Sequence, residues 1–365
     1  MNSHQKKFRL IINLLFFVLI NYQLIANDDL EEKAPIWETH TISQSFCGDG
    51  SPYQIFIRRG DPEKFVFEFQ GGGACWDYRS CTEGFYTDLS FHTRPKKYAI
   101  QSHNPNVSPL SSHTYIYFPY CTGDVFIGAH KKDYLQEFDD LSPEIELGEK
   151  SVLHYGKVNI FNSFEYLQRD LDIDLSNSRE IVSYGGSAGA IGALFHTETI
   201  DQLAGESTRK ILISDSPGLH FANTFWERFS VEQIEDFIEI FDRVGLKFNY
   251  KSGMVIHQIN KFCKRYSGWK MGFLQGTKDT VMSLGFGGKL PIFHKMSVLS
   301  KKGVHESLLD PRDNCAAWVP DSRVHVYATD SHDMKIETSD GVSAMDFVRQ
   351  LVQSKARTLA GVSHR

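Results

Sequence analysis

The sequence predicts an α/β fold in which helices cover both faces of a mostly parallel sheet. From residue 114 onward, β-rich runs alternate with segments of helical periodicity. Such alternation is typical of parallel strands joined by crossover helices. Two long connections, 79–112 and 280–320, contain Pro, Ser and Gly. We expect these insertions to lie over the carboxyl edge of the sheet, where α/β proteins bind their ligands.

The individual elements follow from local composition. Strands are expected where β-branched and aromatic residues form short apolar or alternating runs, at 53–58, 65–70, 114–119, 180–184, 211–214, 270–274 and 324–328. Helices are expected where apolar residues recur with helical spacing, at 159–169, 188–199, 231–244, 253–266 and 343–354.

The amino terminus has the layout of a secretory signal peptide. Lys6, Lys7 and Arg9 precede an apolar run over 10–20, and 24–26 offers a cleavage site. A single membrane anchor is the alternative, but the run is shorter than the roughly 20 residues that span a bilayer. We therefore expect export to the periplasm or the medium, with no stable membrane span after cleavage.

The remaining chain shows no repeat or linker that would divide it. We expect a signal peptide over 1–26, one α/β domain over 27–355, and a loose tail over 356–365. Removing the signal lowers Lys plus Arg from 39 to 36 against 45 Asp plus Glu, a net charge of −9. This balance, without a basic patch, argues against nucleic-acid binding. The sequence does not predict the oligomeric state.

An even number of cysteines behind an export signal indicates disulfides. The six are Cys47, Cys75, Cys81, Cys121, Cys263 and Cys315. Spacing leaves the connectivity open, although Cys75 and Cys81 are close enough to close a local loop. No C-x-x-C or C-x-H spacing supports a zinc site, so we expect neither a metal nor another cofactor.

The segment 180–189 is the most informative in the chain. A β-branched strand runs into the motif G-x-S-x-G, and a helix-forming stretch follows. This arrangement is typical of the nucleophile elbow of an α/β-hydrolase-like fold. Gly185 and Gly189 flank Ser187, which we expect to be the catalytic nucleophile. The alternative is a Gly-rich turn without chemistry.

A serine nucleophile needs a base, and the base needs an acid that orients it. After the elbow, Asp279 and His332 each follow the end of an expected strand, so we predict them as acid and base. Asp215 also ends a strand and is the alternative acid. If Asp215 is not catalytic, we expect its side chain to shape the loop by accepting hydrogen bonds from backbone N–H groups.

Other histidines compete with His332 for the role of base. His325 is expected inside a strand, and His196 inside the elbow helix. His294 and His305 are expected in the long connection 280–320. Each of these positions is less suited to catalysis than the end of a strand.

An esterase also needs N–H donors for the oxyanion of its tetrahedral intermediate. Ala188, the residue after the nucleophile, supplies one. The glycine loop over 69–76, Phe-Gln-Gly-Gly-Gly-Ala-Cys-Trp, follows a strand and offers more. A phosphate loop is the alternative, but no Lys-Ser or Lys-Thr follows the glycines.

Taken together, these motifs resemble the pectin acetylesterase family, which includes the Notum carboxylesterases. The resemblance rests on 70–77, 120–124, 184–190 and 215–218 and extends over most of the chain. It is to the bacterial branch, because Ala74 stands where plant and animal members have Trp. The segment 120–124 has no catalytic role that we derive, and we interpret it as a loop held by Cys121 beside the site.

The resemblance implies a Ser187, Asp279 and His332 triad, with oxyanion donors at Gly73, Ala74 and Ala188. It also implies the disulfides Cys75–Cys81, Cys47–Cys121 and Cys263–Cys315.

We therefore expect an exported serine esterase that hydrolyses O-acetyl groups of a carbohydrate such as pectin through an acyl-enzyme. One alternative is a carboxylesterase of lipid or small acyl esters. The other is an inactive binding protein on the same fold. Because the chain is negatively charged, it does not attract anionic pectin electrostatically.

Overall fold

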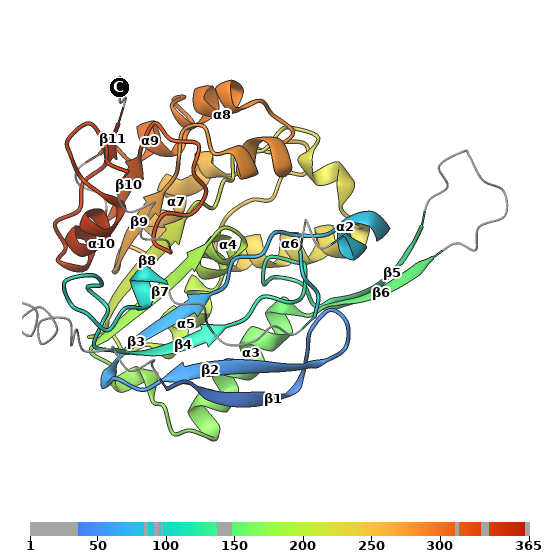
Figure 1. Cartoon of the computed structure of the whole chain (residues 1–365), viewed down its shortest axis with the longest axis horizontal. Helices are drawn as coiled ribbons and strands as arrows, with labels where there is room; N and C mark the ends of the chain where they lie inside the picture. The colour runs from blue at the N-terminus through green and yellow to red at the C-terminus, as the bar shows by residue number, and fades with distance from the viewer. Residues whose placement is uncertain are drawn as a thin grey trace, which may run out of the picture. The chain divides into compact units, whose positions relative to one another are not determined.

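A nine-stranded mixed sheet forms the centre of the described structure (Figure 1). The computed structural model describes residues 36–83, 87–90, 95, 98–136, 148–310, 314–329 and 336–361. The strand order in the large sheet is β1-β2-β4-β3-β7-β8-β9-β10-β11. β1 and β2 pair antiparallel at one edge, and every neighbouring pair from β4 to β11 is parallel. A separate hairpin pairs β5 with β6.

The strands of the large sheet are β1 (Glu38–Phe46), β2 (Pro52–Arg58), β3 (Asp61–Phe69), β4 (His113–Phe118), β7 (Glu180–Gly186), β8 (Arg209–Asp215), β9 (Trp269–Leu274), β10 (Cys315–Val319) and β11 (Leu359–Ala360). The hairpin strands are β5 (His130–Leu135) and β6 (Glu149–His154).

The helices are α2 (Tyr78–Thr82), α3 (Gly156–Arg169), α4 (Ala188–Phe195), α5 (Thr197–Leu203), α6 (Val231–Arg243), α7 (Ile259–Arg265), α8 (Pro291–Val298), α9 (Val304–Ser307) and α10 (Ala344–Val352). Five shorter helical turns join them: η1 (Ala99–Gln101), η2 (Leu175–Asn177), η3 (Phe225–Arg228), η4 (Ile256–Gln258) and η5 (Val281–Gly285). Within the described residues, no helix is long and apolar enough to cross a membrane.

Helices bury apolar side chains against both faces of the sheet. Phe67 and Phe69 of β3 belong to a cluster that includes side chains of α3, α4 and α6. Val66 of β3 and Tyr184 of β7 belong to another, with side chains of α10. The alternation along β3 follows from the twofold period of a strand. The predicted α/β-hydrolase-like fold is therefore confirmed.

The chemistry of single residues explains where several helices begin. Ser230 caps α6 and forms a capping box with Gln233, and Ser343 caps α10. α4 is buried on all sides, as expected for a helix of small and apolar residues next to the sheet. It ends at Phe195, so the predicted helix over 188–199 is divided into α4 and α5.

The strand predicted over 324–328 is wrong. The strand at this position of the sheet is β10, whose Cys-Ala-Ala-Trp-Val sequence has little β-branched character. Residues 324–328 form an irregular segment beyond Pro320. Tyr327 and Ala328 are buried there without strand pairing. Val326 has a φ of 68°, which a β-branched residue rarely adopts.

Part of the predicted tail over 356–365 is also ordered. Leu359 and Ala360 form β11, which pairs parallel with β10. Thr358 contributes as well, because its Oγ1 accepts from the Ala317 amide at 3.1 Å. Residues 359 and 360 of the predicted tail therefore form the edge strand of the sheet.

The three disulfides implied by the resemblance are present: Cys47–Cys121, Cys75–Cys81 and Cys263–Cys315. The first two lie near the glycine loop described below. Cys263–Cys315 joins α7 to β10 across a sequence separation of 52 residues.

Candidate active site

Ser187 lies in a sharp turn between β7 and α4, with φ 58° and ψ −122°. A Cβ on Gly185 would lie 2.0 Å from the Gly189 carbonyl oxygen, and one on Gly189 would lie 2.0 Å from that of Phe69. Only glycine fits at either position. The Ser187 amide donates to the Asp215 carbonyl at 2.8 Å, which joins the turn to the end of β8. This is the geometry expected for a nucleophile elbow.

The glycine loop after β3 packs directly against this elbow. A Cβ on Gly71 would lie 2.7 Å from the Gly186 carbonyl oxygen and 3.4 Å from Ser187 Cβ. Gly73 has a φ of 79°, which orients the backbone of the next residue. In the described part of the chain, the amides of Ala74 and Ala188 donate to no acceptor. These amides are free to bind an anion near Ser187.

Tyr120 braces the glycine loop. Its hydroxyl donates to the Gly73 carbonyl and accepts from the Val125 amide, both at 2.8 Å. Its own amide donates to Gln70 Oε1 at 2.9 Å. The ring occupies the space that a side chain at position 72 would need. The segment 120–124 therefore supports the glycine loop, a role that its interpretation from sequence, a loop held by Cys121 beside the site, did not include.

Asp124, in the same segment, is a buried structural centre. Its carboxylate accepts from Thr122 Oγ1 at 2.6 Å and from the amides of Phe126, Gly128 and Gly156 at 2.7–3.1 Å. These bonds join the connection between β4 and β5 to the start of α3. Burial outweighs them and raises the pKa of Asp124.

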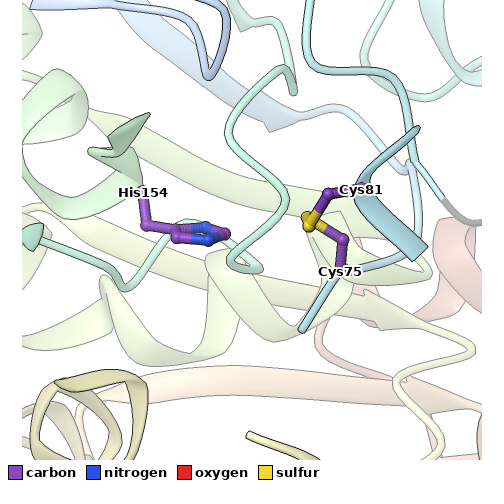
Figure 2. Close-up of side chains that lie close together, drawn as sticks. All are labelled: Cys75, Cys81 and His154. Atoms are coloured by element: carbon purple, nitrogen blue, oxygen red, sulfur yellow. A yellow bond between two sulfur atoms is a disulfide. The ribbon is translucent and has the colours of Figure 1, made fainter. Parts of the chain in front are cut away.

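Figure 2 shows the Cys75–Cys81 disulfide beside His154. Ligand atoms of these three residues lie within 4.8 Å of one another, which is the spacing of a metal site. The sulfur atoms, however, are joined in a disulfide. The imidazole nitrogens of His154 bond the Thr122 carbonyl at 2.8 Å and the Tyr134 hydroxyl at 2.9 Å. The cluster thus fixes the end of the glycine loop through Cys75.

Asp279 lies five residues after the end of β9, is fully buried, and contacts a histidine. Its Oδ2 is 2.8 Å from Nδ1 of His325, and its Oδ1 accepts from the Met282 amide at 2.9 Å. Because a carboxylate only accepts, Nδ1 carries the proton and Nε2 of His325 is left as an acceptor. Within the described residues, this Nε2 has no hydrogen-bond partner.

His332, the histidine that was predicted as the base, lies outside the described residues. His294 bonds the Thr277 carbonyl through Nδ1 at 2.9 Å, and His196 bonds the Phe126 carbonyl through Nε2 at 2.8 Å. His305 contacts Glu306 at 3.2 Å. Among the histidines with described positions, His325 is the one bonded to Asp279.

Asp215, the alternative acid, ends β8 and has backbone partners. Its Oδ2 accepts from the amides of Tyr327 and Ala328 at 2.8 and 2.9 Å. Its Oδ1 accepts from Ser216 Oγ at 3.1 Å, and that hydroxyl accepts from the Val326 amide at 3.0 Å. Burial raises the pKa of Asp215 to about 6. Asp215 therefore holds the segment that carries His325.

Two cavities meet at Ser187. The first is apolar, has a volume of about 40 Å³, and is bounded by Ala74, Ala188 and aromatic side chains such as Phe225 and Phe286. The second has a volume of about 450 Å³ and is bounded by polar as well as apolar residues, and the polar ones include Glu68, Tyr184 and His325. Gly73 borders both. The site can therefore take an ester with a small apolar acyl group and a larger polar alcohol.

Sequence reasoning undervalued His325 because it placed the residue inside a strand. A signal against that interpretation exists, since Pro320 directly follows the apolar run 315–319. A proline there ends a strand, so His325 lies beyond the carboxyl end of the sheet. Glu68, which borders the second cavity, was missed because a single polar residue in an apolar run has no motif.

Comparison with known proteins identifies the family of the chain. The sequence profile of the family described as Pectinacetylesterase matches residues 26–245. The match includes Ser187, the glycine loop and Asp215 and ends before Asp279. No curated protein matches the chain. Because the family profile covers more than half of the sequence, the protein belongs to the pectinacetylesterase family, a family of carboxylic ester hydrolases.

Proposed function

We propose that the protein is an exported serine esterase that removes acetyl groups from a carbohydrate, with Ser187 as its nucleophile. The observation that carries this proposal is the position of Ser187. It lies in a strained elbow at the junction of a small apolar cavity and a larger polar one. His325, bonded to Asp279, borders the same polar cavity.

In the proposed reaction, the base accepts the Ser187 proton while Oγ forms a bond to the ester carbonyl carbon. The carbonyl oxygen becomes an oxyanion, for which the amides of Gly73, Ala74 and Ala188 are the proposed donors. Breakdown of this intermediate releases the alcohol, which takes the proton from the base. Water then attacks the acyl-enzyme with the same base, and acetate and free Ser187 are released.

Asp279 is the proposed acid. Two histidines compete for the role of base. The 2.8 Å contact with Asp279 and the unpaired Nε2 support His325. The family resemblance supports His332. Either residue would have to lie between Asp279 and Ser187 in the reacting enzyme.

Single substitutions of the two histidines decide between them. Replacing the base with Gln lowers kcat by about 10³-fold or more, because no other group takes the Ser187 proton. Replacing the other histidine changes kcat by less than about tenfold. We expect one large and one small effect, measured on p-nitrophenyl acetate. If both substitutions changed kcat by less than about tenfold, neither His325 nor His332 would be the base.

The acyl group is expected to be short. A single water needs roughly 10–15 Å³ of such cavity space, so about 40 Å³ fits an acetyl group. The apolar aromatic lining also favours the alternative, a carboxylesterase of longer acyl esters, if the walls move apart. Rates on p-nitrophenyl esters of two to twelve carbons separate the two, and we expect the acetyl ester to be the fastest.

Ser187→Ala tests the esterase mechanism itself. We expect hydrolysis of p-nitrophenyl acetate to fall to the level of buffer, with an unchanged melting temperature. Full activity in this variant would refute the mechanism. Absence of activity in the unaltered protein on all esters would favour the inactive binding protein.

Export is part of the proposal. It is supported by the signal-like layout of residues 6–26 and by the three disulfides, which persist in oxidising compartments. Cell fractionation with amino-terminal sequencing of the released protein tests it. We expect a mature terminus near residue 27.

A further inference from the structure

Large apolar side chains are exposed along one stretch of the chain, residues 281–296. In the described part of the chain, 13 large apolar side chains are exposed, and six of them lie in this stretch. We call these six the α8 patch: Val281, Leu284, Leu290, Ile292, Phe293 and Met296. They belong to η5, to α8 and to the residue before α8, and the two helical elements contact each other. Apolar patches of this kind mark surfaces that bind a partner or a membrane.

α8 is apolar on the face that a surface helix normally presents to water. His294 and Val298, four residues apart, are buried against the protein. Ile292, Phe293 and Met296 lie on the other side of the helix and are each more than half exposed. A helix that only covers the core has polar or charged residues there. The outer face of α8, at the periphery of the molecule in Figure 1, therefore has the composition of a contact surface.

Lysines lie at the edge of this patch. An open groove of about 750 Å³ beside α8 is bounded by apolar side chains, which include Phe293 and Met296, and by three lysines. The lysines are Lys289, Lys301 and Lys302. The last two are exposed and, within the described residues, have no hydrogen bond or ion pair. The groove therefore combines an apolar wall with free positive charge.

The local charge is opposite to that of the whole protein. Residues 278–302 contain five lysines and one acidic residue, the buried Asp279, whereas the whole chain has a net charge of −6. Asp321 accepts from two of these lysines, Lys278 and Lys295, both at 3.1 Å. In the part of the chain that the structure describes, the three lysines at the groove have no carboxylate partner. Their charge is available to an anionic partner.

A patch of aliphatic and aromatic side chains with free lysines beside it matches the surface of an anionic lipid bilayer. Apolar side chains enter the boundary between head groups and acyl chains, and lysines are attracted to the anionic lipids. A soluble polyanion would need the lysines but not the exposed apolar side chains. A symmetric dimer through this patch would bring the lysines of two copies together, where like charges repel.

We propose that the protein binds the surface of an anionic lipid bilayer through the α8 patch. Its apolar side chains insert among the lipid head groups, and Lys301 and Lys302 bind lipid phosphates. Such binding is peripheral and needs no helix that crosses the bilayer. Val281 of the patch also borders the cavity beside Ser187, so binding places the rim of this cavity at the membrane surface. The proposal does not depend on the esterase function.

Sedimentation with lipid vesicles tests the proposal. Vesicles of equal parts phosphatidylglycerol and phosphatidylcholine are compared with vesicles of phosphatidylcholine alone, and we expect binding to the neutral vesicles to be weaker by about tenfold or more. Lys301→Gln combined with Lys302→Gln should weaken binding to the anionic vesicles about 25-fold, because each lysine near such a surface contributes about fivefold. Lys261→Gln combined with Lys264→Gln is the matched control. It removes the same charge from exposed positions of α7 that do not border the groove, and we expect a change of less than about threefold.

The apolar side chains are tested by a second double variant, Phe293→Ser with Met296→Ser. Because both side chains are exposed, we expect an unchanged melting temperature and binding weaker by about tenfold or more. Loss of binding in the lysine variant but not in this one would assign the surface to a soluble polyanion. Light scattering supplies the other alternative. A dimer of the unaltered protein that becomes a monomer in this variant would assign the patch to a second copy of the chain.

A fluorescent label separates the α8 patch from any contribution of the amino terminus. All six cysteines form disulfides, so Met296→Cys supplies a single free thiol for an environment-sensitive dye. We expect the fluorescence at position 296 to rise severalfold with anionic vesicles. The control is Ile238→Cys, an exposed apolar position on α6, where we expect no change. An unchanged signal at position 296, or equal binding to anionic and neutral vesicles, would overturn the proposal.

Discussion

Asp215 ends β8, and Asp279 lies five residues beyond the end of the neighbouring strand β9. Both are fully buried, and they have different partners. Asp279 contacts the imidazole of His325. Asp215 binds the backbone amides of Tyr327 and Ala328, in the same segment. One carboxylate thus orients a side chain that can carry a proton, and the other holds the main chain that carries this side chain.

The difference shows that position alone does not identify a catalytic acid. Both aspartates satisfy the rule that active-site groups follow strand ends. The two aspartates differ in the chemistry of the group that donates a hydrogen bond to each carboxylate. A backbone amide keeps its proton, whereas an imidazole can release one at ordinary pH.

The largest expected effect follows from placing asparagine at each position. Asp279→Asn removes the charge that favours the imidazolium and permits the wrong tautomer, so we expect kcat to fall about 10³–10⁴-fold. Asp215→Asn keeps an acceptor for the two amides, so we expect kcat to fall less than about tenfold. Steady-state kinetics on p-nitrophenyl acetate measures both. The opposite pattern would assign the acid to Asp215.

The next effect concerns stability. Asp215→Ala leaves the amides of Tyr327 and Ala328 without an acceptor, and we expect a loss of about 2–3 kcal/mol in the free energy of unfolding. Denaturant titration measures it. A loss under about 0.5 kcal/mol would show that the segment holds its conformation without Asp215.

How far the sequence predicts this arrangement depends on the kind of signal. The elbow at Ser187 and the glycine loop are local patterns with a known geometry, and six of the seven expected strands are present. β10 has two alanines in place of β-branched residues, so it was missed, and 324–328 was taken for the strand instead. The contact between Asp279 and His325 joins residues 46 positions apart, and no local pattern encodes it.

The role of Asp215 was also open at the level of sequence. Its neighbours Ser214, Ser216 and Gly218 indicated a loop-shaping carboxylate as well as a catalytic one. Only the approach of 324–328 to the end of β8 shows which amides it binds. Tertiary contacts, and not composition, distinguish the two aspartates.

A smaller effect is expected at Ser216, which links Asp215 to Val326. Ser216→Ala leaves the Val326 amide without its acceptor, at a cost of about 1–2 kcal/mol. Ser214→Ala is the matched control, because its buried hydroxyl donates to the Ala190 carbonyl at 3.1 Å and does not contact 324–328. We expect kcat to fall a fewfold in Ser216→Ala alone. Equal loss of activity in both variants would mean that the effect is general destabilisation.

The smallest effect is a pH dependence that should distinguish Asp215 from its asparagine variant. Burial raises the pKa of Asp215 from 3.8 to about 6, so the folded protein binds this proton more tightly than the unfolded chain does. Stability from this group is therefore full below about pH 4 and declines as the pH rises to about 6. Asparagine does not titrate, so the variant keeps its stability over this range. As the pH rises, the unfolding free energy of the unaltered protein should therefore fall relative to that of Asp215→Asn. Chemical denaturation at pH 4.5 and pH 7 measures the change. A difference that is constant with pH would mean that the three donors around the carboxylate compensate for its burial, and that Asp215 holds 324–328 as a fully ionised group.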